Sequence, residues 1–189
     1  MSAANLGGGL AEIATDSARA FRQALDCMAR PGQIGRIEGA APPAPLSVAA
    51  GTLLLVLADA DTPVHLAGAH DTPALREWLA FHASVAFVEP AAAVWAVGAW
   101  ADLAPIERFP AGSPEYPDRS ATLIVECATL TARGSRLTGP GIADAAWLEL
   151  PDPAALRANA GRFPLGVDCF FTAAAQIAAL PRSTQIGAG

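Results

Sequence analysis

The sequence predicts an α/β fold in which helices cover a layered, mixed β-sheet. Segments with helical periodicity alternate along most of the chain with short apolar segments that have the length of strands. The clearest strand, at residues 121–130, is apolar on both faces, which is typical of a central strand in a covered sheet. A length of 189 residues fits one domain, so we expect a single domain over residues 1–189.

The N-terminal part predicts a loose segment followed by a helix. Residues 1–14 are small and rich in glycine, and we expect them to be loose at their start. Asp16 or Ser17 can cap the helix, and Pro31-Gly32 ends it before a short strand at residues 34–37. The residues on the apolar side of this helix are Phe21, Leu25 and Met28.

The middle of the chain predicts two further helices and short strands between them. The apolar segment after Ser47 could be a helix or a buried strand, and its length favours a helix that ends near Leu57. Asp71 or Thr72 can cap the next helix, with Pro73 in its first turn. The apolar stripe of that helix consists of Leu75, Trp78, Leu79 and His82, and strands are expected at residues 63–67, 85–88 and 94–97.

The C-terminal half predicts a loop, a strand-rich region and one helix. Four prolines between residues 103 and 119 indicate a surface loop with at most a short helical turn. After the strand at 121–130, a turn near Gly134 precedes a strand at 135–138. A short helix is expected at 153–160, with a final strand pair at 167–172 and 176–180.

The charged residues exclude several classes of function. All twelve basic residues are arginines, so neither a Schiff-base lysine for pyridoxal phosphate nor the lysine of a phosphate-binding P-loop is present. A kinase lysine is absent for the same reason. The net charge of −6 argues against nucleic acid as a partner, because a phosphate backbone needs a basic footprint. A small anion could still bind where arginines converge.

Composition also bears on partners, metals and location. Only 16% of the residues are charged and 52% are hydrophobic, which indicates either apolar surface that faces a partner or simply abundant alanine. Cys27, Cys127 and Cys169 lie far apart, so we expect reduced thiols and no metal site. No secretory signal is recognisable, and the apolar run at 48–58 is too short to span a membrane. We therefore expect a cytoplasmic protein that binds no membrane.

Three residues are candidates for acid–base catalysis. His82 could act as a base, although a half-buried histidine on an apolar helix face is the alternative. Asp59 and Asp61 stand with Thr62 at the end of an apolar segment, where a capped turn is the alternative. No complete set of nucleophile, base and orienting partner is recognisable.

Two segments contain groups that suit a phosphate. The first ends a predicted strand with a hydroxyl and two glycines, and its candidate ligand-binding residues are Arg136, Thr138, Gly139 and Gly141. The second, near the C-terminus, offers Arg182, Ser183 and Thr184. The same residues are also ordinary in a turn and in a terminal segment, so neither segment identifies a ligand by itself.

Several short motifs follow one another along the chain in a recognisable order. They are Phe21-Arg22 with Leu25, Met28 and Pro31-Gly32; Leu55–Val64; Phe81-His82; Ala121–Leu123; Leu137–Ile142; Phe163–Asp168; and Leu180–Thr184. The order of these motifs resembles the PhnH family of bacterial phosphonate metabolism, and the resemblance runs from about residue 16 to 184.

The resemblance implies a fold similar to a reduced type I transferase of the pyridoxal-phosphate-dependent class, without that cofactor. It also implies a homodimer that joins PhnG, PhnI and PhnJ in the carbon–phosphorus lyase core complex. With PhnG, PhnI and PhnL, the family is required to attach methylphosphonate to the ribose of ATP and release adenine. ATP would then be a substrate of the complex, and no cofactor would be bound by this chain. No catalytic residue can be transferred from the motifs.

Two hypotheses follow. The first is a complex subunit whose work is mainly structural and which helps shape a nucleotide or phosphonate site. The second is a self-sufficient transferase or hydrolase that acts on a phosphorylated small molecule. It would use Asp59, Asp61 or His82 as acid–base groups and Arg136 or Arg182 as anion clamps. The first is favoured because the catalytic set is incomplete.

Overall fold

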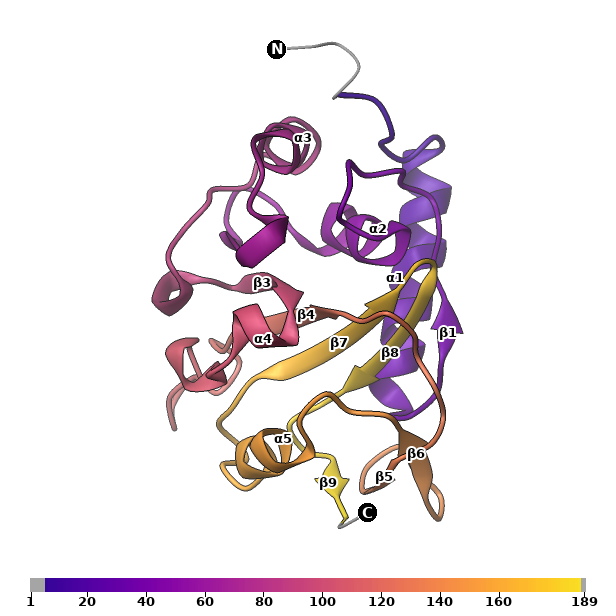
Figure 1. The fold of residues 1–189 in the computed structure, drawn as a ribbon, viewed down its shortest axis with the longest axis vertical. Helices are drawn as coiled ribbons and strands as arrows, with labels where there is room; N and C mark the ends of the chain where they lie inside the picture. Colours follow the sequence, from indigo (N-terminus) through magenta and orange to yellow (C-terminus); the bar gives the residue numbers. More distant parts are fainter. Residues whose placement is uncertain (1–5, 188–189) are drawn as a thin grey trace.

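The structure, a computed structural model that describes residues 6–187, has a six-stranded sheet and a smaller three-stranded sheet (Figure 1). The strand order of the larger sheet is β1-β8-β7-β4-β3-β2. Four neighbouring strands are parallel, and β8 runs antiparallel to β7 and to β1. The predicted mixed α/β sheet is confirmed. Its strands are β1 (Gly35–Arg36), β2 (Val64–Leu66), β3 (Trp95–Ala99), β4 (Thr122–Glu126), β7 (Asp168–Ala173) and β8 (Gln176–Leu180).

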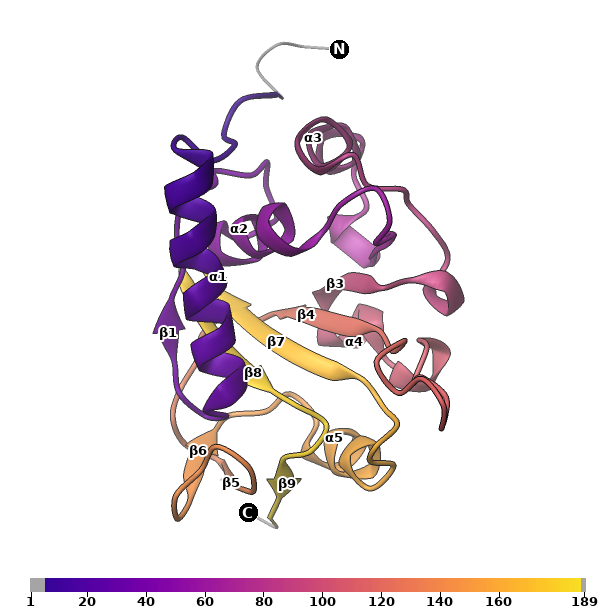
Figure 2. The ribbon, with the colours of Figure 1, turned by 180° about the vertical axis from the view of Figure 1, so that it is seen from behind.

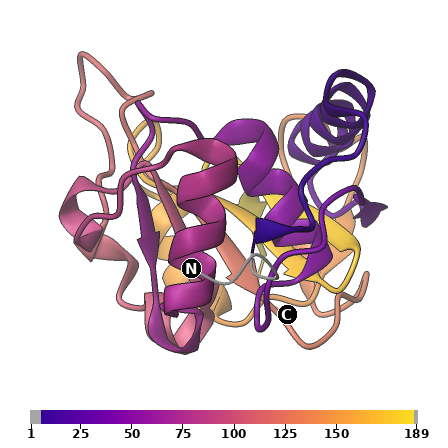
Figure 3. The same cartoon turned by 90° about the horizontal axis from the view of Figure 1, so that it is seen from above.

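Side chains alternate across this sheet and divide the core into two layers. Ile124 and Phe170 face α1 (Ile13–Ala29), α2 (Val48–Leu57) and α3 (Pro73–Ala83), which cover one face (Figure 3). Leu123 and Phe171 face the opposite layer. Both faces are therefore covered, as the doubly apolar sequence of β4 predicts.

The second and third helices begin where the sequence predicts. The Ser47 hydroxyl accepts a hydrogen bond from the Ala50 amide at 3.1 Å, so α2 is a capped helix and not a buried strand. Thr72 caps α3 in the same way, through the Leu75 amide at 3.2 Å.

The first helix differs from the prediction in its start and in its buried face. It begins at Ile13, and Asp16 lies inside the helix, where its carboxylate accepts the Glu12 amide at 2.9 Å. The expected apolar side is wrong for Phe21 and Leu25, which are exposed, whereas Met28 is half-buried against the core. Small side chains let α1 approach α2 and β8 closely. The buried residues of α1 are Ala20, Ala24 and Cys27.

The N-terminal segment, which was expected to be loose at its start, is held by hydrogen bonds from residue 6 onward. The indole Nε1 of Trp78 donates to the carbonyl oxygen of Gly7 at 2.8 Å, and Nε2 of His82 lies 3.0 Å from that of Leu6. The Ala41 amide also donates a hydrogen bond to the carbonyl oxygen of Gly8. Two side chains of α3 therefore fix the segment that leads into α1, while residues 1–5 lie outside the described part of the chain.

The other layer contains short helices and the smaller sheet. The antiparallel strand order there is β6-β5-β9, and β6 and β9 were not predicted. Residues 85–88 form only an isolated bridge to Val64, and β4 ends at Glu126, four residues before the expected end. The remaining elements are α4 (Trp100–Leu103), α5 (Pro153–Ala160), β5 (Ser135–Thr138), β6 (Ala146–Leu148), β9 (Gln185–Ile186) and the 3-10 helices η2 (Gly68–His70), η3 (Pro90–Ala92) and η4 (Ile106–Arg108).

Candidate functional site

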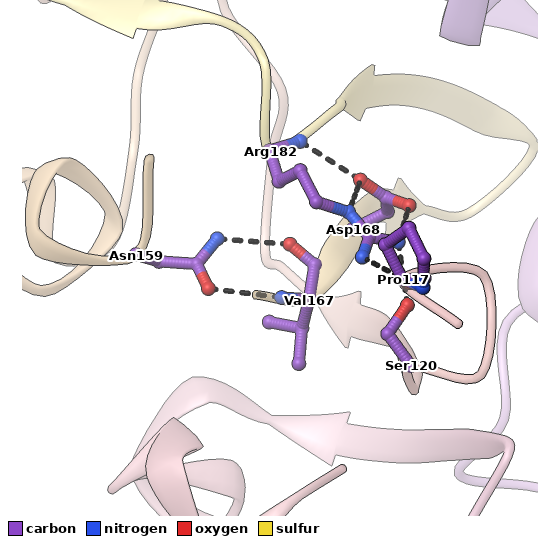
Figure 4. Close-up of polar contacts among 6 residues, drawn as sticks. All are labelled: Pro117, Ser120, Asn159, Val167, Asp168 and Arg182. Atoms are coloured by element: carbon purple, nitrogen blue, oxygen red, sulfur yellow. Dashed lines mark hydrogen bonds and ion pairs between the residues drawn. The ribbon is translucent and has the colours of Figure 1, made fainter. Parts of the chain in front are cut away.

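Segments that are far apart in the sequence meet at the end of the sheet where β4 and β7 begin (Figure 4). Asp168 is the first residue of β7, and Arg182 lies two residues beyond the end of β8, the antiparallel neighbour of β7. The loop before β4 contributes Pro117 and Ser120. Two of the motifs that carry the family resemblance, at residues 163–168 and 180–184, are therefore side by side. We take this cluster as the candidate functional site.

The arginine of this cluster is held on several sides. The Asp168 carboxylate accepts from Nε of Arg182 at 3.1 Å and from Nη2 at 2.6 Å, and the carbonyl oxygen of Pro117 accepts from Nη1 at 2.9 Å. Nη2 also donates to the Ser120 hydroxyl. Only 13% of the Arg182 side chain and 23% of the Asp168 side chain are exposed. Four of the five N–H bonds of the guanidinium are thus used within the chain, which leaves one for a ligand.

A buried amide fixes the backbone just before Asp168. The side-chain nitrogen of Asn159 donates to the Val167 carbonyl at 2.8 Å, and its oxygen accepts the Val167 amide at 2.9 Å (Figure 4). Gly166 has a φ of +119°, and a Cβ there would lie 2.7 Å from the Asn159 oxygen. Only glycine therefore fits at position 166, between Leu165 and Val167.

Beside the ion pair is a small, mainly apolar hollow of about 370 Å³. Phe163 is 60% exposed at its side, and three prolines form much of its wall. Exposed aromatic and proline surface suits contact with another protein better than it suits the solvation of a phosphate. The lining residues besides Asp168 and Arg182 are Pro117, Asp118, Phe163, Pro164, Pro181 and Ser183.

The structure brings the two predicted phosphate-binding segments together through the small sheet. Strand β5 pairs with β9, so that Thr138 lies opposite Gln185, and the Gly187 amide donates to the Arg136 carbonyl at 2.8 Å. Arg136 itself is exposed, whereas Thr184 is buried. Thr138 and Gly139 are half-buried beside them. Anion binding by this group of residues stays a prediction.

The two glycines of this motif have a structural reason. Gly139 has a φ of +123°, and a Cβ there would lie 3.3 Å from the Ser183 carbonyl oxygen. A Cβ on Gly141, whose φ is +81°, would collide with the Ala29 carbonyl oxygen at 1.9 Å. The motif therefore joins the end of α1 to the C-terminal segment, which only glycine permits.

The candidate acid–base residues lie elsewhere. Asp59 and Asp61 are in an exposed turn before β2, where the Asp59 carboxylate accepts the Asp61 amide at 3.0 Å and the Thr62 hydroxyl at 2.9 Å. His82 is half-buried on α3 against Leu6. Strand β2 is four strand spacings from β8, roughly 19 Å at about 4.8 Å each. The Asp59 turn and Arg182 therefore do not form one site, as the self-sufficient enzyme would require.

Sequence reasoning missed a carboxylate at the opposite end of the parallel strands. Glu126 ends β4, and its Oε1 accepts the Ser47 amide at 2.7 Å at the start of α2. Its Oε2 accepts the Thr172 hydroxyl at 3.1 Å. A carboxylate at a helix N-terminus is electrostatically favourable. The long separation of these residues in the sequence left no local signal for this contact.

The adjacent thiol is poorly suited to nucleophilic attack. Burial and the nearby carboxylate of Glu126 raise the pKa of Cys127 to about 11. Burial also raises the pKa of Cys27 and Cys169. Among residues 6–187, no three His, Cys, Asp or Glu side chains are grouped so that they could hold a metal ion. No helix in the same range is both long enough and apolar enough to cross a membrane.

Comparisons with known proteins agree with this picture. Residues 8–187 match the family model described as bacterial phosphonate metabolism protein (PhnH). The chain is also 39% identical, over 95% of its length and 94% of the relative's, to the alpha-D-ribose 1-methylphosphonate 5-triphosphate synthase subunit PhnH of Rhizobium meliloti (strain 1021). The match covers all the motifs from which the sequence predicted a resemblance. The chain therefore belongs to the PhnH family of bacterial phosphonate metabolism proteins.

Proposed function

We propose that this chain is a subunit of an alpha-D-ribose 1-methylphosphonate 5-triphosphate synthase, within the carbon–phosphorus lyase complex that degrades organic phosphonates. The observation that carries the proposal is the 39% identity, over nearly the whole of both chains, to a subunit of that name. The reaction transfers the ribose triphosphate of ATP to methylphosphonate and releases adenine. This chain would be required for it together with partner subunits.

The site geometry supports a role in assembly over independent catalysis. Arg182, the best-placed cation, is occupied by Asp168, and the hollow beside it is mainly apolar. The candidate acid–base residues lie apart from it. A surface of this kind can hold a partner in register and complete a site that other subunits supply. ATP would then be a substrate of the assembled complex, and the chain itself would need no cofactor.

The remaining features of the proposal follow from the family. We propose PhnG, PhnI, PhnJ and PhnL as partner subunits, a homodimer for the free protein, and a location in the cytoplasm. The likeness to a reduced type I transferase of the pyridoxal-phosphate class is proposed as well. The lack of lysine in the sequence agrees with a chain that forms no Schiff base.

Genetic complementation tests the proposal. A Rhizobium meliloti strain that lacks its own PhnH would receive this chain and be grown with methylphosphonate as the sole phosphorus source. Restored growth is expected, because 39% identity over 95% of the chain should preserve the contacts with the partner subunits. Growth on phosphate is the control for viability. Growth on phosphate without growth on methylphosphonate, despite soluble expression of the chain, would contradict the proposal.

A further inference from the structure

The solvent side of α1 carries apolar residues at the spacing of a coiled-coil seam. They follow one another at intervals of four, three, four and three residues, which keeps them on one stripe of the helix. We call this stripe the α1 seam. It consists of Ala14, Ala18, Phe21, Leu25 and Met28.

Most of this seam is left exposed by the fold of the chain, and only Met28, at its C-terminal end, is half-buried against the core. Phe21 is 50% exposed and Leu25 is 56% exposed, and these are the two largest exposed side chains of the α1 seam. Figure 2 shows α1 along the outside of the molecule with no other element over its outer face. The other side of the helix already packs against α2 and β8 through Ala20, Ala24 and Cys27. A heptad stripe of this kind is stabilised when a second helix packs against it.

The charges beside the seam indicate which kind of helix fits. One flank, at Ser17 and Ala24, turns toward the rest of the chain and is half-buried or buried. The other flank is exposed and carries Arg22, with Arg19 next to it. Among the described residues no carboxylate lies within ion-pair distance of either arginine. A partner helix with Asp or Glu beside its own apolar seam would therefore be complementary.

A second copy of this chain fits the seam less well. In an antiparallel pair of identical helices, equivalent flanks lie side by side, which would place Arg22 and Arg19 of one copy beside those of the other. Like charges at such a contact cost free energy, whereas opposite charges select the partner. The chain has a net charge of −6, so this arginine flank also differs from most of its surface.

From the seam and its charged flank we infer that α1 docks an amphipathic helix of another subunit of the complex, with an apolar seam bordered by Asp or Glu. The inference rests on the proposed function, because it needs a multisubunit complex. It assigns the docking surface to residues 14–28. The proposed homodimer would then use a different face.

Affinity purification of the tagged full chain from a host grown on methylphosphonate tests this inference. Leu25→Glu and Phe21→Glu place a carboxylate in the seam and should reduce recovery of the other subunits at least about tenfold, as truncation of a central apolar contact does. Phe81→Glu, a similar change at a 60% exposed position on α3, is the matched control and should leave recovery unchanged. Circular dichroism melting of each purified variant checks that it is folded, which is expected because these side chains are exposed.

A photo-crosslinking residue identifies the occupant. With p-benzoylphenylalanine in place of Phe21, irradiation of the complex should join this chain to an Asp- or Glu-bordered helix of another subunit. Crosslinking to a second copy, or to no protein, would overturn the inference. So would recovery of Leu25→Glu with its partners at the level of the unsubstituted chain. If even the unsubstituted chain recovers no subunit, the proposed function fails and the inference with it. If the unsubstituted chain recovers the other subunits, the proposed function stands. Whether recovery is then lost only in the seam variants tests the docking surface alone.

Discussion

Asp168 and Arg182 are joined by three hydrogen bonds. The Asp168 carboxylate accepts from the backbone nitrogen of Arg182 at 2.8 Å, from Nε at 3.1 Å and from Nη2 at 2.6 Å. This ion pair ties the start of β7 to the turn that follows β8. Because further donors of Arg182 reach Pro117 and Ser120, the same arginine also fixes the loop before β4.

Replacement of Arg182 by Ala should destabilise the protein by about 2–4 kcal/mol. The change leaves a mostly buried carboxylate without its partner, and the cost of breaking a buried pair is reduced here by partial exposure. Urea unfolding followed by circular dichroism measures the difference. Arg136→Ala, at an exposed position, is the control and should stay within about 0.5 kcal/mol. A free energy of unfolding that is the same for both variants would contradict the structural role of Arg182.

Replacement of Asn159 by Ala should also cost about 2–4 kcal/mol. It removes both hydrogen bonds to Val167 and leaves a buried N–H and a buried carbonyl without partners. Thermal and urea unfolding should both report the loss, and the exposed neighbour Arg162→Ala should have little effect. If Asn159→Ala unfolds at the same urea concentration as the unsubstituted protein, the contacts to Val167 contribute little.

Replacement of His82 by Ala should affect stability and not growth on methylphosphonate. Its ring nitrogen is bonded to the Leu6 carbonyl, so we expect a loss of about 1 kcal/mol and faster amide exchange in residues 6–10. Hydrogen exchange with mass spectrometry and the complementation assay measure the two effects. Abolished growth, with a soluble and folded variant, would instead support a catalytic base at this position.

The cysteine thiols should react slowly with alkylating reagents near neutral pH. With the pKa of Cys127 raised to about 11, only on the order of 0.1% of this thiol is ionised at pH 8. The thiolate fraction, and so the rate of labelling by iodoacetamide, should rise about tenfold per pH unit between pH 8 and 10. Denatured protein, in which all three thiols are accessible, is the reference. Native labelling at pH 8 as fast as in the denatured protein would show that Cys127 is not shielded.

Much of the fold could be predicted from local sequence signals. The Ser47 and Thr72 caps mark helix starts, and the apolar pattern of β4 predicts a central strand with two covered faces. The first helix could not be placed as well, because Phe21 and Leu25 have the right periodicity for a buried face. Its buried face is instead built from small residues, since Ala20 and Ala24 allow closer packing. Periodicity alone does not decide between these faces.

The candidate site could be predicted only in part. Arg182 and the turn at residues 136–141 can be recognised in the sequence as groups that suit a phosphate. The contacts of Arg182 cannot, because Asp168 is 14 residues away in the sequence and Ser120 is 62 residues away. Such contacts depend on the register of β7 and β8, which no short motif reveals. The hydrogen bond between Ser47 and Glu126 spans 79 residues and depends on how the start of α2 packs against the end of β4, for which there is no local signal either. Strands β6 and β9 are too short to give a periodic signal.

If this chain is a required subunit of the synthase, the synthase reaction should depend on it. Adenine release from ATP and methylphosphonate can be measured with purified PhnG, PhnI and PhnL, with and without this chain. We expect adenine release only when all four proteins are present, and none from this chain alone. Equal release without this chain, or robust turnover by the isolated chain, would show that it is not a required subunit of the kind proposed.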